Sequence, residues 1–192
     1  MTASRHDESL PAEERARLGA HYTPEALADE LAQVALAPHL AWDPALPFMP
    51  SRDLLRLTIV DPACGDGALL AAAVRCLTPI LIVSMEQEGL PLHSKQAARL
   101  LQRRCVGNDV DAGAVAHAQR LLPWARFSNL DALFDFEVDP QGGPLMFIGN
   151  PPFLGGGKIS SALGQEYLQH IKARFPSFKG RTDLCALFFL AA

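Results

Sequence analysis

The sequence lacks paired cysteines, long uninterrupted apolar runs and an apolar leader. Its four cysteines form no Cys-x-x-Cys pair, and no histidine stands at zinc-ligand spacing to them, so we expect reduced, mostly buried thiols. The longest apolar stretches, 68–74 and 78–83, are interrupted by Arg75 and Pro79, which argues against a membrane-spanning helix. Residues 1–17 are polar and charged, without a signal segment, so we expect a cytoplasmic protein.

Positive charge is also scarce. The chain holds 17 Lys and Arg against 21 Asp and Glu, a formal net charge of −4. A protein that contacts many nucleic-acid phosphates usually carries a basic face. Any such face here must therefore be local, or lie in a partner or in further sequence. The 192 residues suffice for one domain with a sizeable core, and they contain no internal repeat or low-complexity tract.

The pattern strand, turn, helix recurs along the chain. Apolar segments predict strands at 55–60, 105–110, 125–130 and 145–149. Helical patterns cover 24–37, 68–77, 94–104 and 111–122, with a loop at 38–52 and a surface helix and loop at 79–93. This alternation predicts an α/β fold with a parallel sheet and right-handed crossovers.

A glycine-containing loop, Asp61-Pro-Ala-Cys-Gly-Asp-Gly67, directly follows the first predicted strand. A doubly wound sheet places its ligand crevice at this position. Gly65 and Gly67 allow a tight turn and a close approach of a ligand. The spacing is not G-x-G-x-x-G, which makes a dinucleotide loop less favoured. The carboxylates of Asp61 and Asp66 suit a cationic ligand such as S-adenosylmethionine, which carries an ammonium and a sulfonium.

Two further acidic side chains follow predicted strands. Asp109 ends the second strand, where a carboxylate accepts hydrogen bonds from ribose hydroxyls, and Val110 would then pack on an adenine face. Asp111 is expected to cap the next helix. Asp131 follows the third strand and could accept a hydrogen bond from an adenine amine or cap a helix.

The tetrapeptide Asn150-Pro-Pro-Phe153 ends the fourth predicted strand, at the same edge of the sheet. Asn150 offers a side-chain carbonyl and Pro151 a backbone carbonyl, so together they could accept both hydrogens of an exocyclic amine. Such positioning favours methyl transfer to nitrogen without a strong base. Phe153 offers a flat face to a base that has left the duplex stack. The following segment, Gly155–Ser160, fails the P-loop pattern and is predicted to be a flexible loop.

Together these motifs, in this order, resemble the gamma-class amino-methyltransferases of restriction–modification and related phage-defence systems, from Gly19 to about Ala192. Gly19-Ala-His-Tyr-Thr-Pro24 is similar to the family's methionine-contacting motif, and Asp183–Phe188 to a helical motif that flanks the adenine. The resemblance implies cofactor contacts by Thr23, Asp61, Ala63, Gly65, Gly67, Asp109, Val110, Asp131 and Phe188. It implies a catalytic motif of Asn150, Pro151, Pro152 and Phe153, with Phe where Tyr is common.

The resemblance implies a Rossmann-like fold with sheet order 3-2-1-4. It implies adenine-N6 methylation of double-stranded DNA at a specific site, with S-adenosylmethionine as cofactor, no metal and no membrane. Residues 1–18 would be a lead-in segment and 19–192 a partial catalytic domain. Because the family's sheet continues and a target-recognition domain follows, we expect a truncated chain that needs a C-terminal half or a separate specificity subunit.

Three alternatives remain open from the sequence. The first is methylation of a glutamine amide in a protein, which uses a similar Asn-Pro-Pro motif. The second is a non-catalytic fragment or assembly subunit, which the scarcity of positive charge favours. The third is cytosine-N4 methylation, although those enzymes more often carry Ser at the position of Asn150.

Overall fold

The protein folds around a four-stranded parallel sheet, as predicted. The computed structural model describes residues 23–38, 40 and 49–191, so the predicted lead-in and residues 19–22 of the Thr-Pro motif lie outside the described residues. The strands are β1 (Thr58–Asp61), β2 (Cys105–Asn108), β3 (Arg126–Ser128) and β4 (Leu145–Phe147). Their order is β3-β2-β1-β4, all neighbours parallel, which confirms the expected α/β, Rossmann-like arrangement.

Strand register gives the sheet two different faces. Ile59 lies opposite Cys105 and Met146, and all three belong to the main hydrophobic core. Successive side chains on a strand point to opposite faces, so Val60 and its partner Phe147 lie on the other face. Phe147 remains 37% exposed there.

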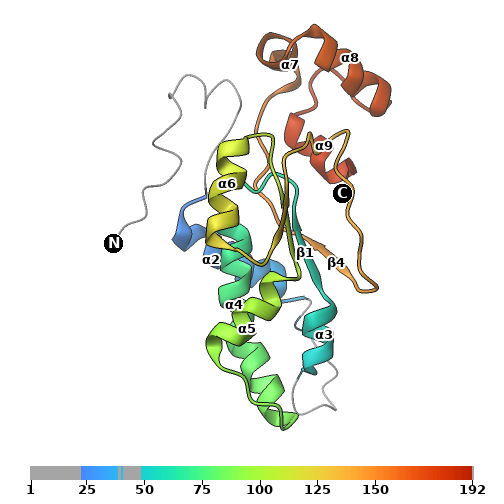
Figure 1. Ribbon diagram of the computed structural model, residues 1–192. Helices are drawn as coiled ribbons and strands as arrows, with labels where there is room; N and C mark the ends of the chain where they lie inside the picture. Colours follow the sequence, from blue (N-terminus) through green and yellow to red (C-terminus); the bar gives the residue numbers. More distant parts are fainter. Residues whose placement is uncertain (1–22, 39, 41–48, 192) are drawn as a thin grey trace.

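Helices gather on one side of the sheet (Figure 1). They are α2 (Glu25–Leu36), α4 (Ala68–Gln87), α5 (Ser94–Gln102) and α6 (Ala112–Leu121). The central helix is α4, which packs against α2, α3, α5 and β1. Its side chains Leu70, Leu77 and Leu81 are almost completely buried, so α4 anchors the sheet to the helical layer.

The long α4 corrects two predictions. The helix does not end at Leu77; it continues through the exposed Pro79 to Gln87, where a surface helix and loop were expected. The apolar residues after the proline keep packing into the core, and this outweighs the lost backbone donor. Among the described residues, α4 alone is long and apolar enough to span a membrane, and 56% of its most apolar window is buried inside the protein.

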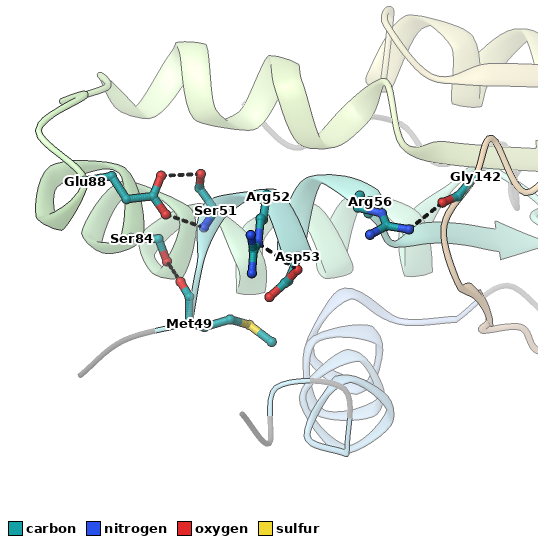
Figure 2. A network of polar contacts seen from close by, with 8 residues as sticks. All are labelled: Met49, Ser51, Arg52, Asp53, Arg56, Ser84, Glu88 and Gly142. Atoms are coloured by element: carbon teal, nitrogen blue, oxygen red, sulfur yellow. Dashed lines mark hydrogen bonds and ion pairs between the residues drawn. The ribbon is translucent and has the colours of Figure 1, made fainter. Parts of the chain in front are cut away.

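A short helix, α3 (Ser51–Arg56), replaces the start of the predicted strand 55–60 and part of the predicted loop 38–52. Figure 2 shows how α3 is fixed to the end of α4. The Ser51 backbone N–H and hydroxyl donate to the two carboxylate oxygens of Glu88, at 2.8 and 2.6 Å. These two bonds lower the pKa of Glu88. The Ser84 hydroxyl donates to the Met49 carbonyl beside them.

Three helices form a separate lobe near the carboxyl ends of the strands (Figure 1). They are α7 (Gly156–Leu163), α8 (Gln165–Arg174) and α9 (Leu184–Ala191). This lobe has its own core, made of Leu133, Leu154, Ile159, Ile171, Phe175, Phe178, Leu184 and Leu187. The expected helix near 183–188 is confirmed by α9, whereas the flexible loop expected at 155–160 is wrong because α7 occupies it.

Close backbone packing explains why α7 begins with glycine. A Cβ on Gly156 would lie 2.6 Å from the Thr182 carbonyl oxygen and 2.8 Å from that of Gly180. Ile159, one turn later, is completely buried in the lobe core. The glycine-rich sequence therefore permits a helix to dock tightly and does not mark a mobile loop.

Candidate functional site

Two adjoining cavities lie where the strands end. The larger, of about 300 Å³, is lined by Pro62, Ala63, Gly65, Asn108, Asp109, Val110, Asp111, Ala114, Asp131, Ala132, Asn150, Pro152, Leu163, Tyr167, Leu184 and Phe188. The smaller, of about 20 Å³, is lined by Thr23, Asp61, Ala63, Cys64, Gly65, Asp66, Ala68, Leu69 and Asn150. Ala63, Gly65 and Asn150 line both, so the cavities are two parts of one site at the predicted edge of the sheet.

Asn150 stands where the two cavities meet. Its amide nitrogen donates to the Thr23 hydroxyl oxygen at 3.4 Å, which joins segments 127 residues apart in the sequence. The preceding Gly149 permits this position, since a Cβ there would lie 3.1 Å from Oδ1 of Asp61. The structure therefore brings the Asn-Pro-Pro motif, the Thr-Pro motif and the loop after β1 together.

The rest of the tetrapeptide diverges from Asn150. Pro152 lines the larger cavity, whereas Pro151 and Phe153 are not among the residues that line either cavity. Phe153 is 56% exposed, which is unusual for a phenylalanine beside a buried site. Its ring is thus available to a partner outside the cavities.

Asp61 is the most buried carboxylate of the site, with 1% exposure. Its Oδ1 accepts a hydrogen bond from the Ala63 N–H at 3.1 Å. Burial nevertheless raises the pKa of Asp61 to about 8, and the nearby Asp109 adds to the rise. A cation placed in the smaller cavity would favour the ionised form, so Asp61 is suited to an ammonium ligand.

Asp109 connects the loops after β1 and β2. Its Oδ2 accepts from the Gly65 N–H at 2.8 Å, and its Oδ1 accepts from the Asp111 N–H at 2.9 Å. Burial raises the pKa of Asp109, although these backbone hydrogen bonds oppose the shift. Gly65 adopts a left-handed φ of 53°, which allows its N–H to face the carboxylate.

Sequence reasoning missed Asn108, which is fully buried at the end of β2. Its amide nitrogen donates to the carbonyls of Pro62 and Leu130, at 3.3 and 3.0 Å. Its Oδ1 accepts from the Ser128 hydroxyl and the Leu130 N–H, at 2.7 and 3.1 Å. One side chain thus fixes the chain after β1, β2 and β3. A polar residue in an otherwise apolar strand was the signal that could have revealed it.

Tyr167 was also missed, and no local pattern could have revealed it. It lies on α8, lines the larger cavity and is hydrogen-bonded to Asp131. Burial and this neighbouring carboxylate raise the pKa of Tyr167. Asp131 also accepts from the Leu133 N–H through Oδ1 at 3.0 Å. Phe188 lines the same cavity, as predicted residues Val110 and Asp131 do.

Other predicted residues serve the architecture. Gly67 is not among the lining residues of either cavity; it begins α4 with φ of 85°, and a Cβ there would lie 3.1 Å from that of Ala118. Asp111 caps α6 as expected, accepting from the Gly113 N–H at 2.7 Å. All four cysteines are free: Cys64 and Cys105 are buried, and Cys76 and Cys185 are partly buried, so the expected burial holds for two of them.

The site combines three carboxylates with apolar side chains. Asp61 lines the smaller cavity, and Asp109 and Asp131 line the larger one together with Leu163 and Phe188. Within the described ranges, no group of three or more His, Cys, Asp or Glu side chains is arranged to hold a metal ion. The arrangement suits an elongated ligand with a cationic end, hydroxyl groups and an aromatic ring that carries a hydrogen-bond donor.

Comparison with known proteins shows similarity to a methyltransferase. No protein-family model matches the chain. The chain is 31% identical over 169 residues to the type II methyltransferase M.MamI of Microbacterium ammoniaphilum. The alignment covers 84% of this chain but 41% of that protein, so the chain spans about two fifths of its relative's length.

Proposed function

We propose that the chain is the catalytic core of a DNA methyltransferase that transfers a methyl group from S-adenosylmethionine to the N6 amine of adenine. The observation that carries the proposal is the position of Asn150, which lines both cavities beside Asp61 and Asp109. The similarity to a type II methyltransferase supports it, and so do the motifs in their sequence order.

The residues of the two cavities fit this cofactor. Asp61 and Thr23 line the narrow part and would hold the ammonium of its methionine portion. Asp109 would accept from the ribose hydroxyls, and Asp131 from the adenine amine. Ala114, with Phe188 on α9, supplies apolar contact for the ring. When bound, the cofactor supplies a methyl group activated by the sulfonium.

Asn150 and Pro151 would hold the target amine. The Asn150 amide nitrogen donates to Thr23, and this bond orients the amide at the junction of the two cavities. Its Oδ1 and the Pro151 carbonyl would each accept one hydrogen of the amine, which turns the nitrogen lone pair towards the methyl group. The exposed ring of Phe153 would stack on the extruded base.

A local excess of basic residues supports DNA as the substrate. Residues 151–191 contain five Lys and Arg but two Asp and Glu, although the whole chain is acidic. We call the exposed side chains Lys158, Lys172, Arg174, Lys179 and Arg181 the basic lobe surface. These side chains belong to the same lobe as α7. The start of α7 at Gly156 lies three residues after Phe153 and packs against the 180–182 segment. Phosphates beside an extruded base would meet this surface.

Further polypeptide would complete the enzyme. The outer face of β4 lines a third cavity of about 360 Å³, together with Phe136, Val138 and Phe188. Phe147 is 37% exposed on this face, and Phe189 is 78% exposed on α9. Apolar side chains of this size usually pack against protein. We propose that a C-terminal half or a separate specificity subunit covers this face and reads the DNA sequence.

The test has two steps. Calorimetry should show that the chain binds S-adenosylhomocysteine, and N150A should bind it within about threefold of wild type, because the Asn150 side chain mainly faces the target amine. With labelled S-adenosylmethionine and duplex DNA, alone or with candidate C-terminal partners, wild type should transfer methyl groups and N150A should lose at least about 100-fold.

Mass spectrometry of the digested DNA should then identify N6-methyladenine. N4-methylcytosine would overturn the choice of base. Methylated glutamine in a protein substrate, with unmodified DNA, would overturn the choice of substrate. Failure of wild type to bind S-adenosylhomocysteine would favour a non-catalytic assembly role.

A further inference from the structure

We propose that Tyr167 is a positioning residue that makes the site select a ring bearing an amine. It would do so by holding Asp131 as a hydrogen-bond acceptor that faces the cavity. This inference rests on the proposed function, because it assigns Asp131 to the adenine of the cofactor. The feature that carries it is the contact of two side chains, from α8 and from the loop after β3, inside one cavity.

The geometry fixes Asp131 from two directions. The Leu133 N–H donates to its Oδ1 at 3.0 Å, and the Tyr167 hydroxyl is hydrogen-bonded to the same carboxylate. The Tyr167 ring packs against the Phe134 ring in a T-shaped arrangement, with centroids 5.5 Å apart and planes at 88°. The phenol therefore reaches Asp131 from a packed position, which restricts the carboxylate to one orientation.

The chemistry of the pair determines what it recognises. A tyrosine hydroxyl is protonated at neutral pH, so Tyr167 can donate to the carboxylate, and burial raises its pKa further. A carboxylate that already accepts two hydrogen bonds has lone pairs left, but it has no hydrogen to give. It would accept from an amine on the ring and repel a carbonyl oxygen at the same place. The lobe that carries Tyr167 thus contributes to ligand choice, although it lies more than 30 residues beyond Asp131 in the sequence.

Calorimetry with two matched ligands tests this role. S-adenosylhomocysteine carries the ring amine, and S-inosylhomocysteine carries an oxygen in its place. We expect Y167F, which keeps the aromatic ring, to bind the adenosyl ligand about 5–20-fold more weakly than wild type. Binding of the inosyl ligand should change by less than about twofold, so the preference for the amine should fall. An unchanged preference overturns the proposal, even if both affinities fall together.

Two further variants separate positioning from packing. F134L weakens the ring contact that holds Tyr167 but leaves the hydroxyl, so the preference should fall less than in Y167F. D131N replaces an acceptor oxygen with an amide donor, so the preference should fall at least as far as in Y167F. In the double variant Y167F/D131N the two effects should not add, because Tyr167 acts through Asp131.

The outcomes distinguish the two proposals. If wild type binds neither ligand, the proposed function fails. If wild type prefers the adenosyl ligand but D131N or Y167F leaves that preference intact, the positioning role fails while the proposed function stands. Should Y167F not fold, an unchanged preference in D131N still overturns the inference, and a reduced preference supports it.

Discussion

Asp61 shows how burial can prepare one carboxylate for a cation. It is almost completely enclosed, and the hydrogen bond that it accepts from the Ala63 N–H does not offset the cost of removing its charge from water. The loop that encloses it also encloses the narrow cavity, so the carboxylate and its ligand would share the same dry surroundings. The same burial makes the stability of the ligand-free protein depend on pH.

We predict that the free energy of unfolding of the ligand-free protein decreases between pH 5 and pH 8 relative to D61N. The pKa of Asp61 is about 8 in the folded state and about 3.9 when unfolded, so the folded state binds an extra proton between these values. That contribution is complete below the lower value and is lost as the pH rises to the upper one. Urea denaturation at both pH values should give a relative decrease of about 1–3 kcal/mol.

The matched control is D135N, which removes an exposed carboxylate of the same type. Its unfolding free energy should follow wild type across the pH range. If D61N and wild type show the same pH profile, Asp61 is not the source of the dependence.

Asn108 makes a second prediction at the residue scale. Replacing it by Ala leaves the partly buried carbonyls of Pro62 and Leu130 and the Ser128 hydroxyl without their amide partner. We expect N108A to destabilise the protein by about 2–4 kcal/mol, measured by urea denaturation. N129A, which removes one exposed hydrogen bond to the Asp109 carbonyl, should cost less than about 1 kcal/mol. Equal losses would contradict a central role for Asn108.

At the element scale, α4 is long despite an unfavourable residue. Pro79 lies in the middle of the helix and cannot donate to the carbonyl one turn earlier. The helix persists because residues on both sides of the proline, including Leu77 and Leu81, are buried against the sheet and neighbouring helices. Tertiary packing here overrides local helix propensity.

We predict that P79A raises the free energy of unfolding by about 1–3 kcal/mol, because alanine restores the backbone donor at an exposed helical position. Chemical denaturation measures the difference. The control is P91A, at an exposed position between α4 and α5, where no helical hydrogen bond is restored. A destabilised P79A would show that the proline ring itself contributes to packing.

The elements that the sequence predicted best are those with a strong local signal. The helix at 112–121 has the Asp111 cap. The strand at 58–61 ends at the acidic Asp61, and the strand at 105–108 is followed directly by Asp109. The errors arose where long-range packing decides the outcome. Buried contacts extend α4 past a proline. Burial of Ile159 and close packing of Gly156 against the 180–182 backbone accompany a helix in the glycine-rich segment.

The candidate site follows the same division. Residues directly after the strands could be placed at one edge because parallel strands end together, and Asn150 and Asp109 do line one cavity. Tyr167 could not be placed at the site from the sequence, because it reaches the cavity from α8, and the position of α8 depends on the packing of the lobe. The roles of the predicted residues toward a bound ligand remain predictions.

At the scale of the whole molecule, charge is unevenly distributed. The basic lobe surface lies on an acidic protein, so repulsion from most of the surface would direct a nucleic acid towards the lobe. The Leu154 N–H, next to Phe153, donates to Oδ1 of Asp183 at 3.2 Å, so the predicted base contact lies near the segment that carries Lys179 and Arg181. This arrangement makes binding sensitive to a small number of side chains.

We predict that K179A/R181A binds duplex DNA more weakly and with a shallower dependence on salt. Losing two phosphate contacts should reduce the slope of log affinity against log salt concentration by about 2. Fluorescence anisotropy at several salt concentrations measures it. K95A removes an exposed lysine on α5, on the other part of the molecule, and should leave the slope unchanged. Equal effects of both changes would argue for non-specific attraction.

The two hydrophobic cores have a consequence for how the molecule responds to occupancy. One core unites the sheet with α2, α4 and α5, and the other holds α7–α9. The larger cavity is lined by the loops that follow β1 and β2 on one side and by Leu163, Tyr167, Leu184 and Phe188 of the lobe on the other. A ligand that fills the larger cavity would contact both the sheet part and the lobe, and would stabilise them together. Melting of the empty protein can proceed in two stages, lobe first, whereas the filled protein should melt as one cooperative unit at a higher temperature.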